Sequence, residues 1–352
     1  MDPDGGTGMS ADPRIRTLPV APPLRSVAEL IAAGLVPAAD GPALEAAAAG
    51  HAVGLTPAMA ALIDPADPAD PIGRQFLPSE AELTRRPEED PDPIGDAARS
   101  PLKGLVHRYP DRVLLKPLHT CPVYCRFCFR RESVGPEGAG TLTEAELRDA
   151  FSYIAARPRI FELIVSGGDP FMLSPRRMGF IAEAAAGIAH VKVTRWHTRV
   201  PLVDPGRLSE KLIAALKRFP GAVYVAIHAN HPREFTPAGR AALARLADAG
   251  IVLLSQSVLL KGVNDDADVL EALMRAFVVN RVNPYYLHHL DLAPGTAHFR
   301  TSIAEGRALM RALSARLSGI AQPTYVVDLP GGHGKVPLGP GAGGPQKTRD
   351  HP

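Results

Sequence analysis

Cysteine is scarce in this chain of 352 residues, which contains only three. So small and odd a number cannot form the disulfide framework of a secreted domain, and that class is excluded. Cys121, Cys125 and Cys128 fall within eight positions of the sequence. Such close spacing indicates a metal or redox site.

An excess of one charge, a long apolar run and a leader segment are also lacking. The 39 basic and 37 acidic residues leave a net charge of +2, too small to mark a nucleic-acid-binding or membrane-surface protein. No apolar run approaches the roughly 18 residues that span a bilayer. The first twenty residues have neither the apolar core of a signal peptide nor the character of a transit peptide. We therefore expect a cytoplasmic protein with neither nucleic acid nor membrane as a partner.

Composition divides the chain into three segments. Residues 1–100 are rich in Ala, Pro and Asp and predict a mainly helical and irregular wrapping extension, with short helices at 26–34 and 55–63. Residues 339–352 are rich in Gly and Pro and predict a disordered tail. The regular pattern lies between them, in residues 101–338.

Strand-like runs recur through this central segment, and a helical pattern follows each one. The runs are short and continuously apolar, as in buried parallel strands, and lie at 112–118, 162–167, 191–197, 222–229, 251–260 and 283–290. The helical patterns begin with a capping box at Thr143 and Glu146 and continue at 174–188, 206–218, 235–249, 266–279 and 302–318. Six βα units predict an α/β fold, an open partial TIM-type barrel, with a doubly wound sheet as the alternative.

The cysteines follow the first predicted strand with the spacing C-x3-C-x2-C. Three thiolates can bind three irons of a [4Fe–4S] cluster and leave the fourth iron open to a ligand. A zinc site completed by His119, or unrelated buried thiols, are the alternatives. Zinc favours a fourth ligand at a recognisable spacing, and none stands out.

This spacing, followed by six βα units, resembles the radical S-adenosylmethionine (SAM) superfamily. The resemblance implies that the open iron binds SAM and that a flavodoxin- or ferredoxin-type reductant drives its cleavage to a 5′-deoxyadenosyl radical. It places Phe127 near the adenine. It also assigns to SAM binding the second strand end and two later positions, namely Ser166, Gly167, Gly168, Asp169, His228 and Gln256. An ordinary βα turn is the alternative explanation for the two glycines.

A second motif lies at 328–337, DLPGGHGKVP, where a lysine follows a glycine-rich stretch. Taken alone, Lys335 is better explained as a solvated surface lysine. Together with the cysteine motif, it resembles the lysine 2,3-aminomutase family over residues 70–337. The shared stretches include DPIG (92–95), HRYPDRVL (107–114), CRFCFRR (125–131), NPYYLHHLD (283–291) and PTYVVDLPGG (323–332).

The family resemblance implies further roles. Lys335, in a flexible loop, would bind pyridoxal 5′-phosphate, and Arg108, Tyr109 and Arg112 would hold its phosphate group, since guanidinium groups suit phosphate oxygens. Substrate binding would fall to Arg130 for the carboxylate and to Asp291 and Asp328 for the distant ammonium. Surface ion pairs for the arginines and turn capping for the aspartates are the alternatives.

The expected activity is that of an isomerase that moves the amino group of L-lysine from C2 to C3, by a 5′-deoxyadenosyl radical acting on lysine joined to pyridoxal phosphate. Arginine 2,3-aminomutase and the elongation factor P-associated lysine enzyme are alternatives within the class. An iron–sulfur electron carrier and a zinc-binding interaction module are the alternatives outside it. A homodimer is left open.

Overall fold

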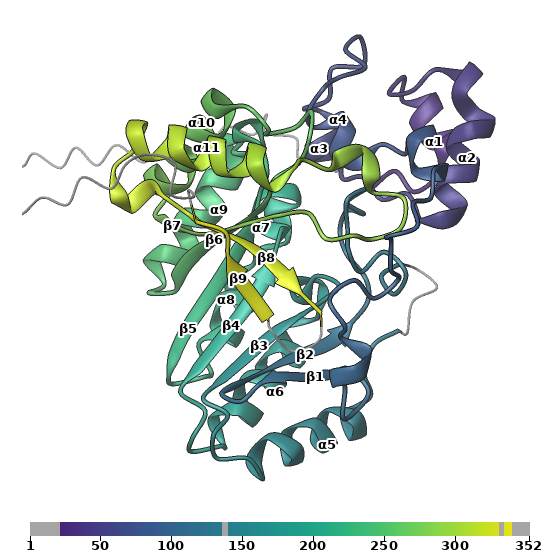
Figure 1. The fold of residues 1–352 in the computed structure, drawn as a ribbon. Helices are drawn as coiled ribbons and strands as arrows, with labels where there is room; N and C mark the ends of the chain where they lie inside the picture. The colour runs from purple at the N-terminus through teal and green to yellow at the C-terminus, as the bar shows by residue number, and fades with distance from the viewer. Residues whose placement is uncertain (1–21, 136–139, 331–333, 340–352) are drawn as a thin grey trace, which may run out of the picture.

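The computed structural model describes residues 22–135, 140–330 and 334–339, and in these ranges nine strands form one sheet in chain order. The strands are β1 (Leu105–Tyr109), β2 (Arg112–Leu118), β3 (Glu162–Gly167), β4 (Val193–Thr198), β5 (Ala222–His228), β6 (Val252–Val258), β7 (Val282–His288), β8 (Thr324–Leu329) and β9 (Gly334–Pro337). Strands β2 to β8 are parallel, each paired with the next, whereas β1 and β9 pair antiparallel with β2 and β8. Figure 1 shows the sheet curving through the molecule.

The α/β class is confirmed, and the six predicted runs correspond to β2–β7. The sheet is larger than predicted, because β8 adds a seventh parallel strand and β1 and β9 flank the parallel set. A strand was not predicted at 324–329 because Asp328 interrupts its apolar run, although the structure buries that carboxylate. In the described ranges the strands follow chain order without a reversal, which excludes the doubly wound alternative.

Helices follow the parallel strands, as predicted. They are α5 (Glu144–Ala155), α6 (Pro175–Ala186), α7 (Val200–Val203), α8 (Glu210–Leu216), α9 (Pro237–Asp248), α10 (Ala267–Val279) and α11 (Ile303–Arg316). Apart from α7, each begins at a side chain that accepts a hydrogen bond from a backbone N–H of the first turn, as capping predicts. These caps are Thr143, Ser174, Ser209, Thr236, Asp266 and Ser302. The capping box at Thr143 is confirmed.

Strand register separates the core from an inner face. Leu115, Val165, Trp196 and Val225 are neighbours across β2–β5, and all are buried in the main hydrophobic core. Because side chains alternate along a strand, the adjacent row points to the opposite face. That row includes Arg195, which lines a cavity. The alternation therefore builds a core on one side of the sheet and a site on the other.

The N-terminal segment contributes α1 (Val27–Ala32), α2 (Gly41–Gly50), α3 (Pro57–Ala60) and α4 (Gly73–Phe76). Helices α1 and α3 lie within the predicted ranges, whereas α2 and α4 were not predicted. These helices gather at one end of the molecule, away from α5 (Figure 1).

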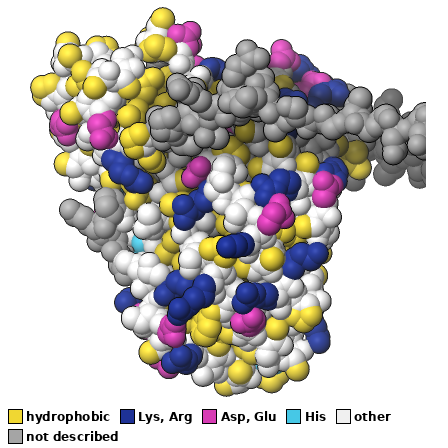
Figure 2. Space-filling view, turned by 180° about the vertical axis from the view of Figure 1, so that it is seen from behind, with side chains coloured by type: hydrophobic (Ala, Val, Ile, Leu, Met, Phe, Trp, Pro, Cys, Tyr) yellow, Lys and Arg dark blue, Asp and Glu magenta, His cyan; other side chains and the backbone are white. Residues whose placement is uncertain are grey.

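In the described part of the chain, no helix is long and apolar enough to cross a membrane. On the face opposite to that of Figure 1, acidic and basic side chains are interspersed (Figure 2).

A buried ion cluster ties this segment to the cysteine loop. Arg126, fully buried, donates to both carboxylate oxygens of Glu82 at 2.8 and 2.7 Å and to the carbonyl of His51 at 2.8 Å. Arg131 Nη2 lies 2.6 Å from Glu82 Oε2. One carboxylate from the N-terminal segment thus pairs with two arginines of the loop.

Glu82→Gln should lower the free energy of unfolding by roughly 3–5 kcal/mol, because it leaves two arginines buried without a counter-charge. Urea denaturation of the cofactor-free protein measures this loss. Glu80→Gln is the matched control, since Glu80 is exposed and its substitution should change stability by less than about 0.5 kcal/mol. Equal losses of stability in the two variants would show that the ion pairs of Glu82 do not stabilise the fold.

Candidate active site

All of the site residues predicted from the sequence line one cavity of about 250 Å³. They come from the cysteine loop, from the carboxyl ends of the parallel strands, and from β1, the start of β2 and β9. In chain order they are Arg108, Tyr109, Arg112, Cys121, Cys125, Phe127, Cys128, Arg130, Ser166, Gly167, Gly168, Asp169, His228, Gln256, Asp291, Asp328 and Lys335. Residues as far apart in the sequence as Arg108 and Lys335 therefore meet, as expected when parallel strands end at one edge.

The cysteine loop follows β2, and its three cysteines are free thiols. Burial raises the pKa of each thiol, that of Cys128 to about 11, so iron binding must release protons. Within the described ranges, no three His, Cys, Asp or Glu side chains are grouped to hold a single metal ion. Because each cysteine of a [4Fe–4S] cluster binds a different iron, three thiols on one loop fit that cluster.

Gly167 and Gly168 hold the start of this loop against the end of β3. Gly167 has φ of +103°, and a Cβ there would lie 2.6 Å from the carbonyl oxygen of Leu118. A Cβ on Gly168 would lie 2.4 Å from that of Thr120. The Gly168 N–H also donates to Leu118 O at 2.8 Å. Backbone packing therefore requires both glycines, whatever ligand approaches them.

Asp169 and His228 differ in their environment: Asp169 is held by hydrogen bonds between strands, whereas His228 is a buried, uncharged side chain. Asp169 accepts hydrogen bonds from the Thr198 hydroxyl at 2.7 Å and the Arg199 backbone N–H at 2.8 Å, so it joins the ends of β3 and β4. Burial, reinforced by the charge of Arg199, lowers the pKa of His228 to about 3, and its imidazole is therefore neutral. The structure thus gives Asp169 a scaffolding role that the sequence did not indicate.

Lys335 lies on strand β9, so its predicted position in a flexible loop is wrong. The hairpin register puts it opposite Asp328, and its Nζ lies 2.5 Å from Asp328 Oδ2. The Lys335 backbone N–H donates to the Tyr109 hydroxyl at 2.9 Å. The preceding glycine-rich residues 331–333, like the predicted tail from residue 340 onward, lie outside the described residues.

The two arginines predicted to bind the phosphate group have different partners, a carboxylate for Arg108 and an aromatic ring for Arg112. Arg108 Nη1 lies 2.6 Å from Asp328 Oδ1, so this arginine and Lys335 share one carboxylate. The Arg112 guanidinium lies 3.6 Å from the centre of the Tyr109 ring, a cation–π contact. Two guanidinium groups and a phenol therefore line the cavity together with Lys335, a set of donors that fits a phosphate-bearing cofactor.

Arg130 has a carboxylate partner that sequence analysis missed. Its Nη2 lies 2.9 Å from Asp96 Oδ2, and Lys116 Nζ lies 3.5 Å from the same oxygen. Burial alone would raise the pKa of Asp96, but the charges of Arg130 and Lys116 lower it, so Asp96 is ionised. The DPIG motif stops one residue before Asp96, and an acidic residue following that motif was the available signal.

Two histidines of the cavity were also missed. His197 and His288 each have a buried Nε2 with no hydrogen-bond partner in the described structure. Burial, with Arg195 beside His197 and Lys335 beside His288, lowers both pKa values well below the ordinary range. Both rings are neutral, and their unpaired nitrogens suit a polar ligand, since buried polar atoms are normally hydrogen-bonded.

Comparison with known proteins shows which family the chain resembles. Residues 115–274 match the Radical SAM superfamily. An L-lysine 2,3-aminomutase of Acetoanaerobium sticklandii is 41% identical over 81% of this chain and 69% of that protein. An L-lysine 2,3-aminomutase of Escherichia coli is 38% identical over 77% of this chain and 79% of that protein. A glutamate 2,3-aminomutase of Clostridioides difficile is 36% identical over 81% of this chain and 67% of that protein.

The barrel-like sheet and the cysteine loop define a radical SAM enzyme. More narrowly, the chain belongs to the lysine 2,3-aminomutase family of isomerases. Membership of the superfamily implies a [4Fe–4S] cluster and SAM as cofactors. The resemblance inferred from the motifs is therefore confirmed.

The pH dependence of stability tests the surroundings of Asp291. Burial, with the nearby Asp328 carboxylate, raises the Asp291 pKa from 3.8 to about 7. Between these pH values native Asp291 keeps a proton that the unfolded chain has lost, so stability falls as the pH rises. Asp291→Asn lacks this proton and should lose that decline.

Urea unfolding of the cofactor-free protein at pH 4.5 and at pH 7 makes the measurement. The wild-type protein should lose stability relative to Asp291→Asn by a few kcal/mol, given about 1.4 kcal/mol per pKa unit. Parallel pH profiles for the two proteins would show that Asp291 titrates normally.

Proposed function

We propose that this enzyme converts L-lysine to L-β-lysine by moving the amino group from C2 to C3. The supporting observation is that one cavity is lined by the cysteine loop, by Lys335 and by the carboxylates Asp291 and Asp328. Arg130 lines the same cavity. A guanidinium for the substrate carboxylate and two carboxylates for its distant ammonium match the charges of lysine.

We propose the cofactor set as a [4Fe–4S] cluster, SAM and pyridoxal phosphate, with a flavodoxin- or ferredoxin-type donor of electrons. When bound, the cluster and SAM supply a carbon-centred radical, and pyridoxal phosphate supplies a π-system through which an amino group can migrate. The chain supplies Cys121, Cys125 and Cys128 for the irons and Lys335 for the aldehyde.

Lys335 must lose a proton before its amine can react as a nucleophile. Asp328 Oδ2, 2.5 Å from Lys335 Nζ, fixes the position of that nitrogen in the cavity. Arg108, ion-paired with the other oxygen of Asp328, keeps the carboxylate oriented toward the lysine. These contacts support Lys335 as the cofactor lysine.

Substrate binding would change the state of Asp291. The pKa of Asp291 is about 7, because burial and Asp328 oppose its ionisation. An ammonium group beside it favours the ionised form, so a cationic substrate end would convert Asp291 to a carboxylate. A second carboxylate at that place would instead be repelled. This argument favours lysine over glutamate, and arginine remains the alternative cation.

Lys335→Ala should abolish the pyridoxal adduct that borohydride traps on the protein, because the reactive amine is removed. Peptide mass mapping should find the wild-type adduct on Lys335. The iron content should be unchanged, since the cysteines lie on a different segment. Lys217→Ala is the control, because Lys217 is exposed and should leave the adduct intact. An adduct on another lysine would refute this assignment.

Asp291→Asn should lower kcat/KM for lysine roughly 30- to 5,000-fold, corresponding to about 2–5 kcal/mol for an underpaired buried ammonium. An anaerobic assay of the reconstituted protein on lysine, arginine and glutamate makes the measurement. Asp291 is a cleaner test than Asp328, which also contacts Lys335. Iron and pyridoxal phosphate contents are the controls. A wild-type preference for glutamate would overturn the proposal.

A further inference from the structure

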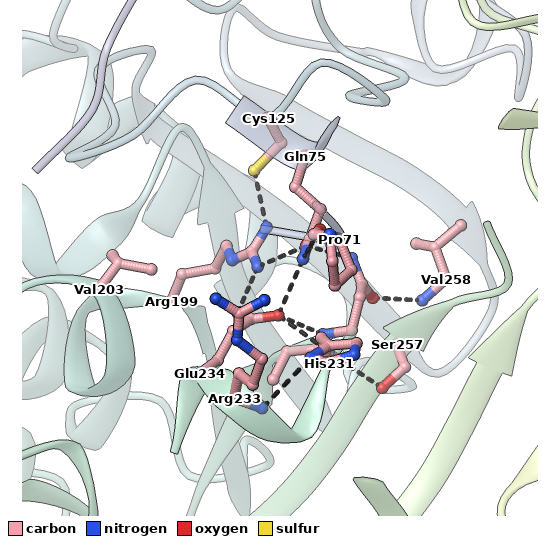
Figure 3. Close-up of polar contacts among 12 residues, drawn as sticks. Pro71, Gln75, Cys125, Arg199, Val203, His231, Arg233, Glu234, Ser257 and Val258 are labelled. Atoms are coloured by element: carbon pink, nitrogen blue, oxygen red, sulfur yellow. Dashed lines mark hydrogen bonds and ion pairs between the residues drawn. The ribbon is translucent and has the colours of Figure 1, made fainter. Parts of the chain in front are cut away.

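Arg199 connects the cysteine loop to a buried polar network (Figure 3). It follows β4, and its Nη1 donates to the Cys125 sulfur at 2.9 Å. Its Nη2 donates to Glu234 Oε2 at 2.6 Å and to Gln75 Oε1 at 3.1 Å. Gln75 lies in α4 and Glu234 beyond β5, so four segments of the chain meet at this one guanidinium.

Glu234 is fixed as firmly as the arginine that it neutralises. It is fully buried, and its Oε1 accepts the backbone N–H groups of Asn230 at 2.8 Å and His231 at 3.0 Å. The Gln75 amide donates to the same oxygen at 3.3 Å and accepts from the Asn230 side chain at 3.1 Å. Because Glu234 and Gln75 are themselves held in place, they keep the Arg199 guanidinium next to the Cys125 sulfur.

Stability alone does not account for this arrangement. A buried ion pair contributes little net stability compared with apolar side chains of similar volume. Arg126, the neighbouring buried arginine, donates to Glu82 and to backbone carbonyls. Arg199 instead directs an N–H group at a cysteine sulfur that belongs to the proposed iron site. The difference between the two arginines indicates a function for that contact.

We propose that Arg199 is a positioning residue that raises the reduction potential of the [4Fe–4S] cluster through its hydrogen bond to Cys125. This inference rests on the proposed binding of the cluster by the three cysteines. On reduction the cluster gains one electron from a flavodoxin- or ferredoxin-type donor, which is oxidised by one electron. No bond to the protein forms or breaks. A cationic N–H donor on the ligand sulfur stabilises the added negative charge.

Arg199→Gln removes the charge and the guanidinium fork, whereas Arg199→Lys keeps the charge but not the planar geometry. The readout is the ratio of reduced to oxidised cluster, measured by electron paramagnetic resonance at fixed potentials in the reconstituted protein without SAM. At the wild-type midpoint, this ratio should fall about tenfold in Arg199→Gln, a shift of about 59 mV for one electron. It should fall less in Arg199→Lys.

Arg126→Lys is the control, a change that keeps the charge of a buried arginine beside Cys125 whose guanidinium donates to Glu82 and to backbone carbonyls rather than to the sulfur. Its ratio should stay at the wild-type value. An unchanged ratio in Arg199→Gln with about four irons bound, or an equal fall in Arg126→Lys, would overturn the proposal. If Arg199→Gln binds no iron, Arg199→Lys decides, and an unchanged ratio there also overturns it. Wild-type protein that binds no iron would refute the cluster itself instead.

Discussion

Two arginines are buried on either side of Cys125, and each is neutralised by a carboxylate from a distant segment. Arg126, the next residue in the sequence, pairs with Glu82, and Arg199 pairs with Glu234. Leaving either charge unpaired would cost several kcal/mol, so both carboxylates stabilise this conformation of the loop. The cysteine loop is thus held in place from two directions, by a carboxylate of the N-terminal segment and by an arginine and a carboxylate of the barrel-like part.

The parallel sheet supplies the second constraint, because it sets the face toward which each side chain points. Alternate residues of one strand belong to the core and to the cavity, as Trp196 and Arg195 do on β4. Packing of the core residue fixes the position of the strand. The strand in turn fixes where the adjacent, cavity-facing side chain lies. Positions at the carboxyl ends of successive strands then meet without any requirement on the loops between them. This explains how a cavity lined by many charged groups can rest on a fully apolar core.

Sequence reasoning succeeded where the signal is local. The spacing of the cysteines, the cap at Thr143 and the apolar runs each reflect neighbours within a few residues, and the structure places them as expected. It failed where partners are remote. Asp96 pairs with Arg130 across 34 positions, and no periodicity records that contact. Lys335 was expected in a loop because glycines precede it, whereas its strand exists through pairing with β8.

The position of Lys335 late in the chain has a consequence for the order in which the protein is made. Its backbone bond to Tyr109 spans 226 residues. At about 5–20 residues per second, translation reaches Lys335 about 10–45 s after Tyr109. Throughout that interval the cysteine loop is already synthesised, while the β8–β9 hairpin that flanks the cavity is not. The growing chain therefore contains its three cysteines well before Lys335 has been made, so the two ends of the cavity are completed at different times.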